Sequence, residues 1–149
     1  MRAVVQRVSH SKVSVGDRLV GEIGRGLLVL IGVTHDDDQK DADYLVDKIV
    51  NLRIFDDADG KMNLSLLDSG GEMMVVSQFT LYGDTRGGRR PSFIAAAPGS
   101  EAMSHYEHFV AKARESISNI STGEFGSMMD VELVNDGPVT IILDSEKTI

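Results

Sequence analysis

The polar side chains of the stretch VVSQFTL are the first candidates for chemistry in this sequence. Ser77, Gln78 and Thr80 lie within an apolar run, Val75 to Leu81, that predicts a buried strand. Polar groups that are removed from water need hydrogen-bond partners. These hydroxyl and amide groups therefore either bond to neighbouring backbone or face a ligand, and the local sequence leaves both alternatives open.

An activated nucleophile is not recognisable in this sequence. A hydroxyl nucleophile normally needs a base that accepts its proton, and none of the four histidines belongs to a recognisable triad motif. The chain has no GxSxG motif, and the glycines of GDTRGGRR lack the spacing and the lysine of a phosphate loop. The pattern favours catalysis by positioning and by backbone donors.

A second candidate is the Gly137–Pro138 dipeptide, which lies between two predicted strands in the segment NDGPVT. Bonds that precede proline are the one common place for cis peptides. Local sequence alone favours a tight turn here, because Asn, Asp, Gly and Pro are typical turn residues. A role in a binding site is the alternative.

Three arginines, Arg86, Arg89 and Arg90, form a small basic patch on an acidic chain. The formal net charge of -8 argues against a protein that binds along the phosphate backbone of a nucleic acid such as DNA, because that binding depends on many lysines and arginines. A local patch can still contact a few phosphates. The alternative for these residues is a solvated turn.

Neither of two possible metal motifs predicts a metal site. His105 and His108 have a spacing that can ligate a metal, but their helical angles point them towards solvent and no third ligand is evident. The acidic segment DDADGK fails as a calcium loop. With Gly60 at the sixth position, Phe55 and Leu66 fall where carboxylate ligands are required.

The elements that must position these residues include strands at both ends of the chain. Residues 3–33 predict three or four strands joined by short turns, and residues 130–135 and 139–144 predict two more. Between them, Asp36 to Asp38 supply N-cap oxygens for a helix. Its apolar positions recur every three or four residues from Ala42 to Leu52.

The middle of the chain predicts a loop, a strand and a second helix. A surface loop or hairpin over DDADGKMNLSLLDSGGE leads to a strand from Met73 to Leu81. The helix runs from about Ser100 to Ser118. Its expected buried stripe comprises Met103, Tyr106, Val110, Ala113 and Ile117. The whole pattern predicts an α/β fold of mixed, largely antiparallel β-sheets packed together, with two main α-helices on one side.

Length and composition favour one domain that spans residues 1–149. A chain of 149 residues with 42% hydrophobic residues is long enough for one core and too short for two. It contains no cysteine, it opens with a strand-like pattern in place of a signal core, and no apolar run approaches the roughly 18 residues of a membrane span. We expect a cytoplasmic protein that binds no membrane.

Several motifs taken together resemble those of the D-aminoacyl-tRNA deacylases along essentially the whole chain. The segments that resemble the family are AVVQRVSHSKVSV, GLLVLIGV, RIFDDADGKMNLS, VVSQFTL, RRPSF and NDGPVT. SQFTL and GPVT are the two signature motifs of that family, and their joint presence at this separation is specific. The resemblance implies a homodimer, without a cofactor, that hydrolyses the ester between a D-amino acid and the 3′-terminal ribose of tRNA.

The resemblance also implies a role for residues outside the first motif. Gly137 and Pro138 match a dipeptide, with its peptide bond cis, that projects from one subunit into the site of the other. Arg7 matches a residue that helps to fix the position of that dipeptide. Phe125 and Met129 match positions that wall the pocket, and their alternative is ordinary core packing.

Within SQFTL, the backbone N–H groups near Phe79 and Thr80 are the candidates to hold the ester carbonyl and the oxyanion that develops from it. Ser77 and Gln78 would orient the terminal adenosine or an attacking water. Thr80 has two possible roles. As a covalent nucleophile it needs a base that the sequence does not reveal, whereas as a positioning hydroxyl it needs none, and the vicinal 2′-OH of the substrate can assist.

An enzyme that accepts many D residues and rejects every L residue must read the arrangement around the α-carbon. A rigid cis dipeptide offers two carbonyl oxygens to the α-ammonium group and leaves no volume where an L side chain would project. Glycine has no side chain to exclude, so we also expect hydrolysis of the glycyl ester.

Two other functions remain open at this point. One is a hydrolase of another small ester or amide, for which tRNA is irrelevant. The other is a non-catalytic module that binds tRNA or a nucleotide, in which SQFTL and GPVT are only a strand and a turn. If the partner is the 3′ end of an aminoacyl-tRNA, Arg86, Arg89 and Arg90 are the candidates for contacts with acceptor-end phosphates.

Overall fold

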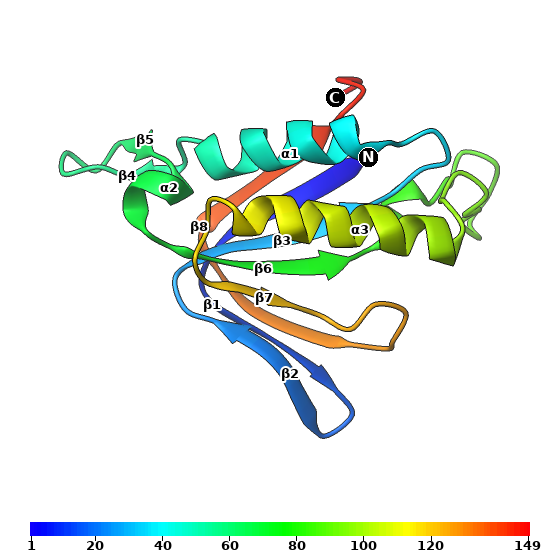
Figure 1. Ribbon diagram of the computed structural model, residues 1–149, viewed down its shortest axis with the longest axis horizontal. Coiled ribbons are helices and arrows are strands. Elements are labelled where there is room, and N and C mark those ends of the chain that lie inside the picture. Colours follow the sequence, from blue (N-terminus) through cyan, green and yellow to red (C-terminus); the bar gives the residue numbers. More distant parts are fainter.

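The computed structural model describes residues 1–149, and its centre is a six-stranded sheet (Figure 1). The strand order is β2-β1-β3-β6-β7, and β8 pairs with the other edge of β1. The strands are β1 (Arg2–Val15), β2 (Arg18–Ile23), β3 (Gly26–Gly32), β6 (Glu72–Ser77), β7 (Ile120–Thr122) and β8 (Asp130–Asp144). β1 is antiparallel to its three partners, whereas β3, β6 and β7 are parallel.

The two ends of this strand order, β2 and β7, approach one another. The Ser121 hydroxyl donates to the Glu22 carbonyl oxygen at 3.0 Å, and a Cβ at Gly21 would lie 2.8 Å from the Thr122 carbonyl oxygen. The sheet therefore nearly closes into a barrel. A side-chain hydrogen bond joins its outer strands, and they lie so close together at Gly21 that a larger residue would not fit.

Helices α1 (Gln39–Asn51) and α3 (Gly99–Arg114) lie side by side on one face of the sheet (Figure 1). Asp38 caps α1 as predicted, since its side chain accepts from the amides of Lys40 and Asp41. The α/β fold with mixed, largely antiparallel strands and two main helices on one side is confirmed.

The buried stripe of α3 was predicted in part. Tyr106, Val110 and Ala113 are buried in the helix, and Ile117 is buried just beyond its end at Arg114. The prediction for Met103 was wrong, because this side chain is exposed, and Ala102 and Phe109 fill the stripe instead. The helix also ends at Arg114, four residues before the predicted end at Ser118.

Two apolar clusters hold the sheet, one on each face. The larger contains 24 buried residues between the helices and the sheet, and the smaller contains six on the opposite face. Leu27, Val29 and Ile31 of β3 belong to the first cluster, whereas Leu28 belongs to the second. The run GLLVLIGV is continuous in hydrophobicity because β3 is covered on both faces.

The segment between α1 and β6 forms the expected hairpin, β4 (Phe55–Asp56) with β5 (Met62–Leu64), and then the short helix α2 (Leu66–Ser69). This helix was not predicted from the sequence. Ser65 and Asp68 form a capping box there, and Gly70 ends it in the left-handed conformation.

The predicted strand from Met73 to Leu81 was wrong over its last four residues. β6 ends at Ser77, and the chain continues as the 3₁₀ helix η1 (Phe79–Tyr82). The ladder with β3 ends there. Its last hydrogen bond, 2.7 Å long, runs from the backbone N–H of Gln78 to the Ile31 carbonyl oxygen. Gly32 then lets the turn pack closely, because a Cβ there would lie 3.0 Å from Leu81 and 3.1 Å from the Gln78 carbonyl oxygen.

The two strands predicted at residues 130–135 and 139–144 are one strand, β8, so the prediction of two strands joined by a tight turn at Gly137–Pro138 was wrong. Both halves pair antiparallel with β1, which keeps the chain in one direction. The register moves from Gln6 opposite Thr140 to Val8 opposite Asn135. Residues 136–139 therefore loop out of the ladder opposite the single residue Arg7.

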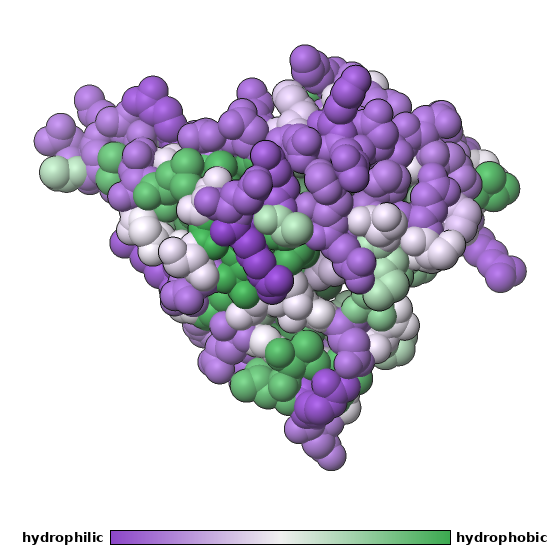
Figure 2. Space-filling view, in the orientation of Figure 1, coloured by the Kyte–Doolittle hydropathy of each residue, from purple (hydrophilic) through white to green (hydrophobic).

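The surface over the helices is mostly hydrophilic, and apolar patches appear below them over the strands (Figure 2). β8 carries exposed apolar side chains at Val134 and Ile142, and Leu19 is exposed on β2. None of the helices is long and apolar enough to cross a bilayer.

We predict that Gly26→Ala unfolds the protein or lowers its free energy of unfolding by at least about 3 kcal/mol. A Cβ at this position would lie 1.8 Å from the Glu72 carbonyl oxygen, so the β3–β6 ladder could not close. Urea denaturation followed by circular dichroism measures the effect. Gly87→Ala is the matched control, because nothing lies within 4 Å of its Cβ. Equal urea midpoints for the two variants would contradict the prediction.

Candidate active site

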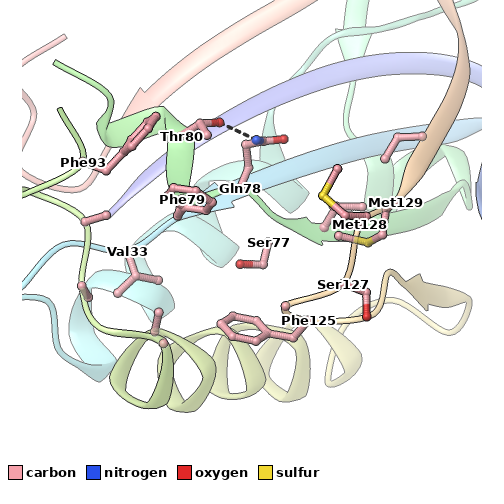
Figure 3. Close-up of a pocket in the computed structure, with 17 residues that line it drawn as sticks. Val33, Ser77, Gln78, Phe79, Thr80, Phe93, Phe125, Ser127, Met128 and Met129 are labelled. Atoms are coloured by element: carbon pink, nitrogen blue, oxygen red, sulfur yellow. Dashed lines mark hydrogen bonds between the residues drawn. The ribbon is translucent and has the colours of Figure 1, made fainter. Parts of the chain in front are cut away.

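A pocket of about 800 Å³ opens where β6 ends (Figure 3). Its walls come from η1, the segment before α3, the start of α3 and the loop between β7 and β8. The lining residues are Val33, Val76, Ser77, Gln78, Phe79, Thr80, Phe93, Ala96, Ala97, Gly99, Ala102, Phe125, Gly126, Ser127, Met128, Met129 and Val131. No Asp, Glu, His, Lys, Arg, Cys or Tyr is among them, so the pocket offers only hydroxyl, amide and backbone groups for polar contacts.

The segment SQFTL enters this pocket at the turn from β6 into η1. The first amides of a helix have no intrahelical carbonyl partner. Gln78 is the N-cap residue of η1, and its side chain makes no capping hydrogen bond. The N–H groups of Phe79 and Thr80 therefore donate no bond to their own cap and can donate to an acceptor in the pocket.

The side chains of the same segment are arranged around these amides. The side-chain amide nitrogen of Gln78 donates to the Thr80 hydroxyl oxygen (Figure 3). Because Thr80 accepts this bond, its own O–H is free to donate. The half-buried Ser77 directs its hydroxyl into the pocket between Phe79 and Phe125. Of the two alternatives that the sequence left open, a bond to neighbouring backbone is not seen for these side chains. The recorded bond joins the side chains of Gln78 and Thr80, and all three residues line the pocket.

Phe125 and Met129 form the wall opposite η1. The Phe125 ring lies 5.8 Å from the ring of Tyr106, whose hydroxyl donates to the Val75 carbonyl oxygen at 2.8 Å. Burial raises the pKa of Tyr106 to about 12, so this hydroxyl stays a neutral donor. The Met129 sulfur accepts from the Glu124 amide at 3.3 Å. Both wall residues are therefore held from behind by the core and by their own loop.

Glu124 organises the loop that carries these wall residues. Its carboxylate accepts from the Ser127 hydroxyl at 2.6 Å and from the Arg18 guanidinium at 2.9 Å. The Ser127 bond, followed by the Arg18 bond, lowers the pKa of the Glu124 carboxyl below its ordinary value. The loop is thereby tied to itself and to the β1–β2 hairpin.

Gly137 and Pro138 do not line this pocket. They are exposed at the tip of the loop formed by residues 136–139, and the peptide bond between them is cis. The structure thus separates the sequence-predicted residues into two groups within one chain. The SQFTL residues, Phe125 and Met129 lie together, whereas Gly137 and Pro138 lie elsewhere, with Arg7.

Arg7 holds the base of the exposed loop. Its guanidinium is almost fully buried and donates to the carbonyl oxygens of Asp136 at 3.2 Å and Ile54 at 2.7 Å. The carboxylates of Asp136 and Asp56 lie 3.2 and 3.5 Å from it. These contacts join β1, β8 and the β4–β5 hairpin at the point where the loop leaves the sheet.

Asn135 closes the same loop from the other side. With its amide nitrogen turned towards two carbonyl oxygens, it donates to Val139 at 3.1 Å and to Arg7 at 3.0 Å, and its oxygen accepts from the Thr140 hydroxyl at 3.2 Å. The backbone before and after the dipeptide is therefore cross-linked, and the dipeptide itself remains free for contacts outside the chain.

The three arginines of GDTRGGRR lie beyond η1 and outside the pocket lining. Arg86 is paired with Asp84, at 2.9 Å through Nε and 2.7 Å through a terminal nitrogen. This guanidinium lowers the pKa of the Asp84 carboxyl. Arg89 and Arg90 are exposed and form no ion pair, so two of the three charges are free for a partner.

The histidines stand apart from the pocket. His108 lies 2.8 Å from Asp43 on α1, and His35 contacts the Ile94 carbonyl oxygen at 2.6 Å. No group of three or more His, Cys, Asp or Glu side chains is arranged to hold a metal ion. Phe93 and Met128 line the pocket but were not predicted as wall residues, because residues in irregular loops follow no periodic pattern.

Comparisons with known proteins identify the class. The model of the D-Tyr-tRNA(Tyr) deacylase family matches residues 4–144. A D-aminoacyl-tRNA deacylase of Clostridioides difficile (strain 630) is 62% identical over 148 residues, which are 99% of each chain. One of Thermosipho africanus (strain TCF52B) is 58% identical over 147 residues, again 99% of each. These similarities confirm the expected class, an enzyme of the deacylase type and hence a hydrolase.

More specifically, the chain belongs to the D-Tyr-tRNA(Tyr) deacylase family. Solved structures share its fold. The structure of the c-Myc DNA Unwinding Element Binding Protein is 42% identical, with a TM-score of 0.92 over 97% of this chain and 98% of that one. That of a probable eukaryotic D-amino acid tRNA deacylase is 18% identical, with a TM-score of 0.83 over 95% and 97%, and shows the fold alone.

We predict that Thr80→Ala lowers the rate of deacylation by about tenfold or less, because a neutral hydrogen bond contributes about 0.5–1.5 kcal/mol. The uncharged pocket contains no side chain that could act as a base for a nucleophilic threonine. Release of labelled amino acid under single-turnover conditions measures the rate, and Thr80→Ser is the control. Loss of activity to background, together with a trapped acyl-enzyme in the wild type, would show covalent catalysis instead.

Proposed function

We propose that residues 1–149 act as one deacylase domain that hydrolyses the ester between a D-amino acid and the 3′-terminal ribose of tRNA, without a cofactor. The observation that carries this proposal is the pair of backbone N–H groups, of Phe79 and Thr80, that have no capping partner and lie in a pocket lined by no ionisable side chain. Relatives named D-aminoacyl-tRNA deacylases, up to 62% identical over 99% of the chain, support the substrate class.

The proposed reaction is the addition of water to the ester carbonyl. The oxygen of the water bonds to the carbonyl carbon, and the carbonyl oxygen becomes an oxyanion held by the amides of Phe79 and Thr80. The carbon–oxygen bond to the ribose then breaks, and the 3′ oxygen leaves with a proton. The adjacent 2′-OH can relay that proton, while Ser77 and Gln78 orient the water or the terminal adenosine.

Chiral selection is proposed to need a second copy of the chain. Gly137 and Pro138 project from their own subunit and do not reach its pocket, whereas Arg7 and Asn135 fix the loop that carries them. In a homodimer this loop would enter the pocket of the partner. Its carbonyl oxygens would accept from the α-ammonium group, and its bulk would occupy the volume that an L side chain requires.

The exposed edge of the sheet supports this homodimer. β8 pairs with β1 on one side only, so the other edge of a 15-residue strand is unpaired. Val134 and Ile142 are exposed on the same strand, on either side of the dipeptide. A second copy placed against this surface would bury apolar area where the proposed selectivity loop crosses between subunits.

Contacts with tRNA are proposed to be few. Arg86, Arg89 and Arg90 are the candidates for acceptor-end phosphates, and Arg86 already shares its charge with Asp84. With a net charge of -8 on the chain, the affinity should depend only weakly on salt. The same charge disfavours double-stranded DNA as a ligand, because no extended basic surface is available.

We predict rapid hydrolysis of a D-aminoacyl-tRNA, measurable hydrolysis of glycyl-tRNA, and resistance of the L form of the same aminoacyl-tRNA. The expected order follows from exclusion of the L side chain. A time course on the three substrates measures it, with a free D-amino-acid ester as a fourth substrate. Equal rates on D and L forms would refute chiral selection, intact substrates would indicate a binding module, and hydrolysis of the free ester alone would indicate another esterase.

A cross-subunit site predicts complementation between two inactive variants. Gly137→Val should disable the loop, because this residue has φ near +125° and a Cβ there would lie 2.8 Å from Val139 and 3.2 Å from Arg7. Ala96→Trp should fill the pocket. A heterodimer of the two variants keeps one site with an intact pocket and an intact partner loop.

We expect about half of the wild-type deacylation rate from the purified heterodimer and almost none from either homodimer. Differently tagged subunits, refolded together and purified through both tags, supply the sample. The folding of each variant is checked by its urea midpoint. A heterodimer as inactive as the two homodimers, with folded subunits, would place both elements in one subunit and refute the arrangement.

A further inference from the structure

The single turn η1 carries the two amides proposed to hold the oxyanion, and its own hydrogen bonds do not fix how it lies on the sheet. Within the turn, the Leu81 N–H donates to the Gln78 carbonyl oxygen at 3.2 Å. The Gly83 N–H closes the turn by donating to the Thr80 carbonyl oxygen at 2.9 Å. The start of η1 is tied to β3 by the bond from Gln78 to Ile31. The last carbonyl groups of a helix have no intrahelical partner, so the other end of η1 needs a donor from elsewhere.

Arg2, the first residue of β1, supplies that donor. Its Nη1 donates to the Leu81 carbonyl oxygen at 3.1 Å. The same guanidinium lies over the ring of Tyr82, with its central carbon 4.6 Å from the ring centroid. A cation above an aromatic ring is attracted by the electrons of its face. Arg2 therefore contacts both of the last two residues of η1.

The Arg2 side chain is itself held by the C-terminal part of the chain. The start of β1 pairs with the end of β8, so that Arg2 lies opposite Asp144 (Figure 1). The buried Asp144 carboxylate lies 3.4 Å from the Arg2 Nε. It also accepts from the Thr148 hydroxyl and from the Glu146 backbone N–H. The guanidinium therefore connects η1 to a carboxylate that two other donors fix in place.

The position of Arg2 in the sheet lets it act on η1 directly. In the β1–β3 ladder Arg2 is the partner of Gly32, where a Cβ would lie 3.0 Å from Leu81 and 3.2 Å from Tyr82. The glycine leaves space for the turn, and the arginine on the neighbouring strand holds the turn in that space. Because η1 has only four residues, a shift of its end also reorients the peptide groups at its start, including the N–H of Thr80.

The contacts of Arg2 do not extend to the pocket. Arg2 is not among the lining residues, and 38% of its side chain is exposed. It therefore acts on a substrate in the pocket only through η1. Because this side chain belongs to neither apolar cluster, its removal leaves the core intact.

We infer that Arg2 is a positioning residue for the deacylation. It holds the end of η1 so that the Phe79 and Thr80 N–H groups point together at the oxyanion, and it touches no substrate. This inference rests on the proposed function and adds the residue that orients its backbone donors.

The test is the kinetics of Arg2→Gln on a D-aminoacyl-tRNA. We expect kcat to fall about 10- to 100-fold, because the two N–H groups stabilise the transition state only when they are aligned. KM should stay within about twofold, since the ground state gains little from that alignment. Arg2→Lys keeps the charge and one donor but cannot reach Leu81 and Asp144 together, so its kcat should lie between those of Arg2→Gln and the wild type.

Arg25→Gln is the matched control. Arg25 is also exposed and also lies over an aromatic ring, that of Phe55 at 5.7 Å, but it makes no contact with η1. The substitution removes the same charge from the same sheet. Its kcat and KM should equal those of the wild type, and the urea midpoint of each variant measures its folded fraction.

A second readout needs no activity. In protein labelled with 15N-phenylalanine and 15N-threonine, the backbone N–H signals of Phe79 and Thr80 report the orientation of η1. We expect both signals to shift in Arg2→Gln and to stay in place in Arg25→Gln. The signal of Phe109, which is fully buried in the core, should be the same in all three proteins.

The outcomes separate the two proposals. A kcat of folded Arg2→Gln within twofold of the wild type, an equal loss in Arg25→Gln, or a loss explained by its unfolded fraction would overturn the role of Arg2. If Arg2→Gln does not fold, Arg2→Lys decides in the same way. A wild-type enzyme that hydrolyses no D-aminoacyl-tRNA, while the Phe79 and Thr80 signals still shift in Arg2→Gln, would overturn the proposed function and leave the hold of Arg2 on η1 intact.

Discussion

The end of the β3–β6 ladder is the constraint on which the site depends. Parallel pairing holds the chain as a strand up to Ser77. The pairing stops with the hydrogen bond from the backbone N–H of Gln78 to the Ile31 carbonyl oxygen. The backbone must then turn, and Gly32 gives it room to form a 3₁₀ helix directly against the sheet. The amides at the start of that turn lose their ladder partners and gain no cap. A break in regular structure thus supplies the polar groups that the apolar walls of the pocket lack.

A second break, in the β1–β8 ladder, supplies the other half of the proposed site. Four residues of β8 oppose the single residue Arg7, so the excess backbone leaves the sheet. A loop of this kind is ordinarily mobile, but here a buried guanidinium and the Asn135 amide bind the carbonyl oxygens on both sides of the dipeptide. The two breaks place a recess and a projection at different points of one subunit. In the proposed homodimer, this recess and this projection would meet between two copies related by symmetry.

The sequence predicted the regular parts of this fold well and the irregular parts poorly. A continuous apolar run located β3, because this strand is buried on both faces, and periodic hydrophobicity located α1 and most of α3, because each helix is buried on one face. The same reasoning extended β6 through Leu81 and divided β8 at its dipeptide, since both features depend on where a partner strand ends or shifts. The motifs pointed to the SQFTL residues, four of which line the pocket, but the free backbone amides of Phe79 and Thr80 follow from the turn, which no side-chain pattern encodes.

The absence of ionisable side chains from the pocket agrees with a substrate that brings its own charges. An aminoacyl ester on tRNA carries an α-ammonium group, and its ribose offers a vicinal hydroxyl. A fixed carboxylate in the pocket would bind the ammonium group of either enantiomer and would relax chiral selection. Backbone carbonyl oxygens on a rigid loop accept the same group only in one geometry. In the proposed homodimer, an uncharged pocket completed by the backbone of the partner loop would favour selectivity over affinity, as an enzyme that must leave correctly charged tRNA intact requires.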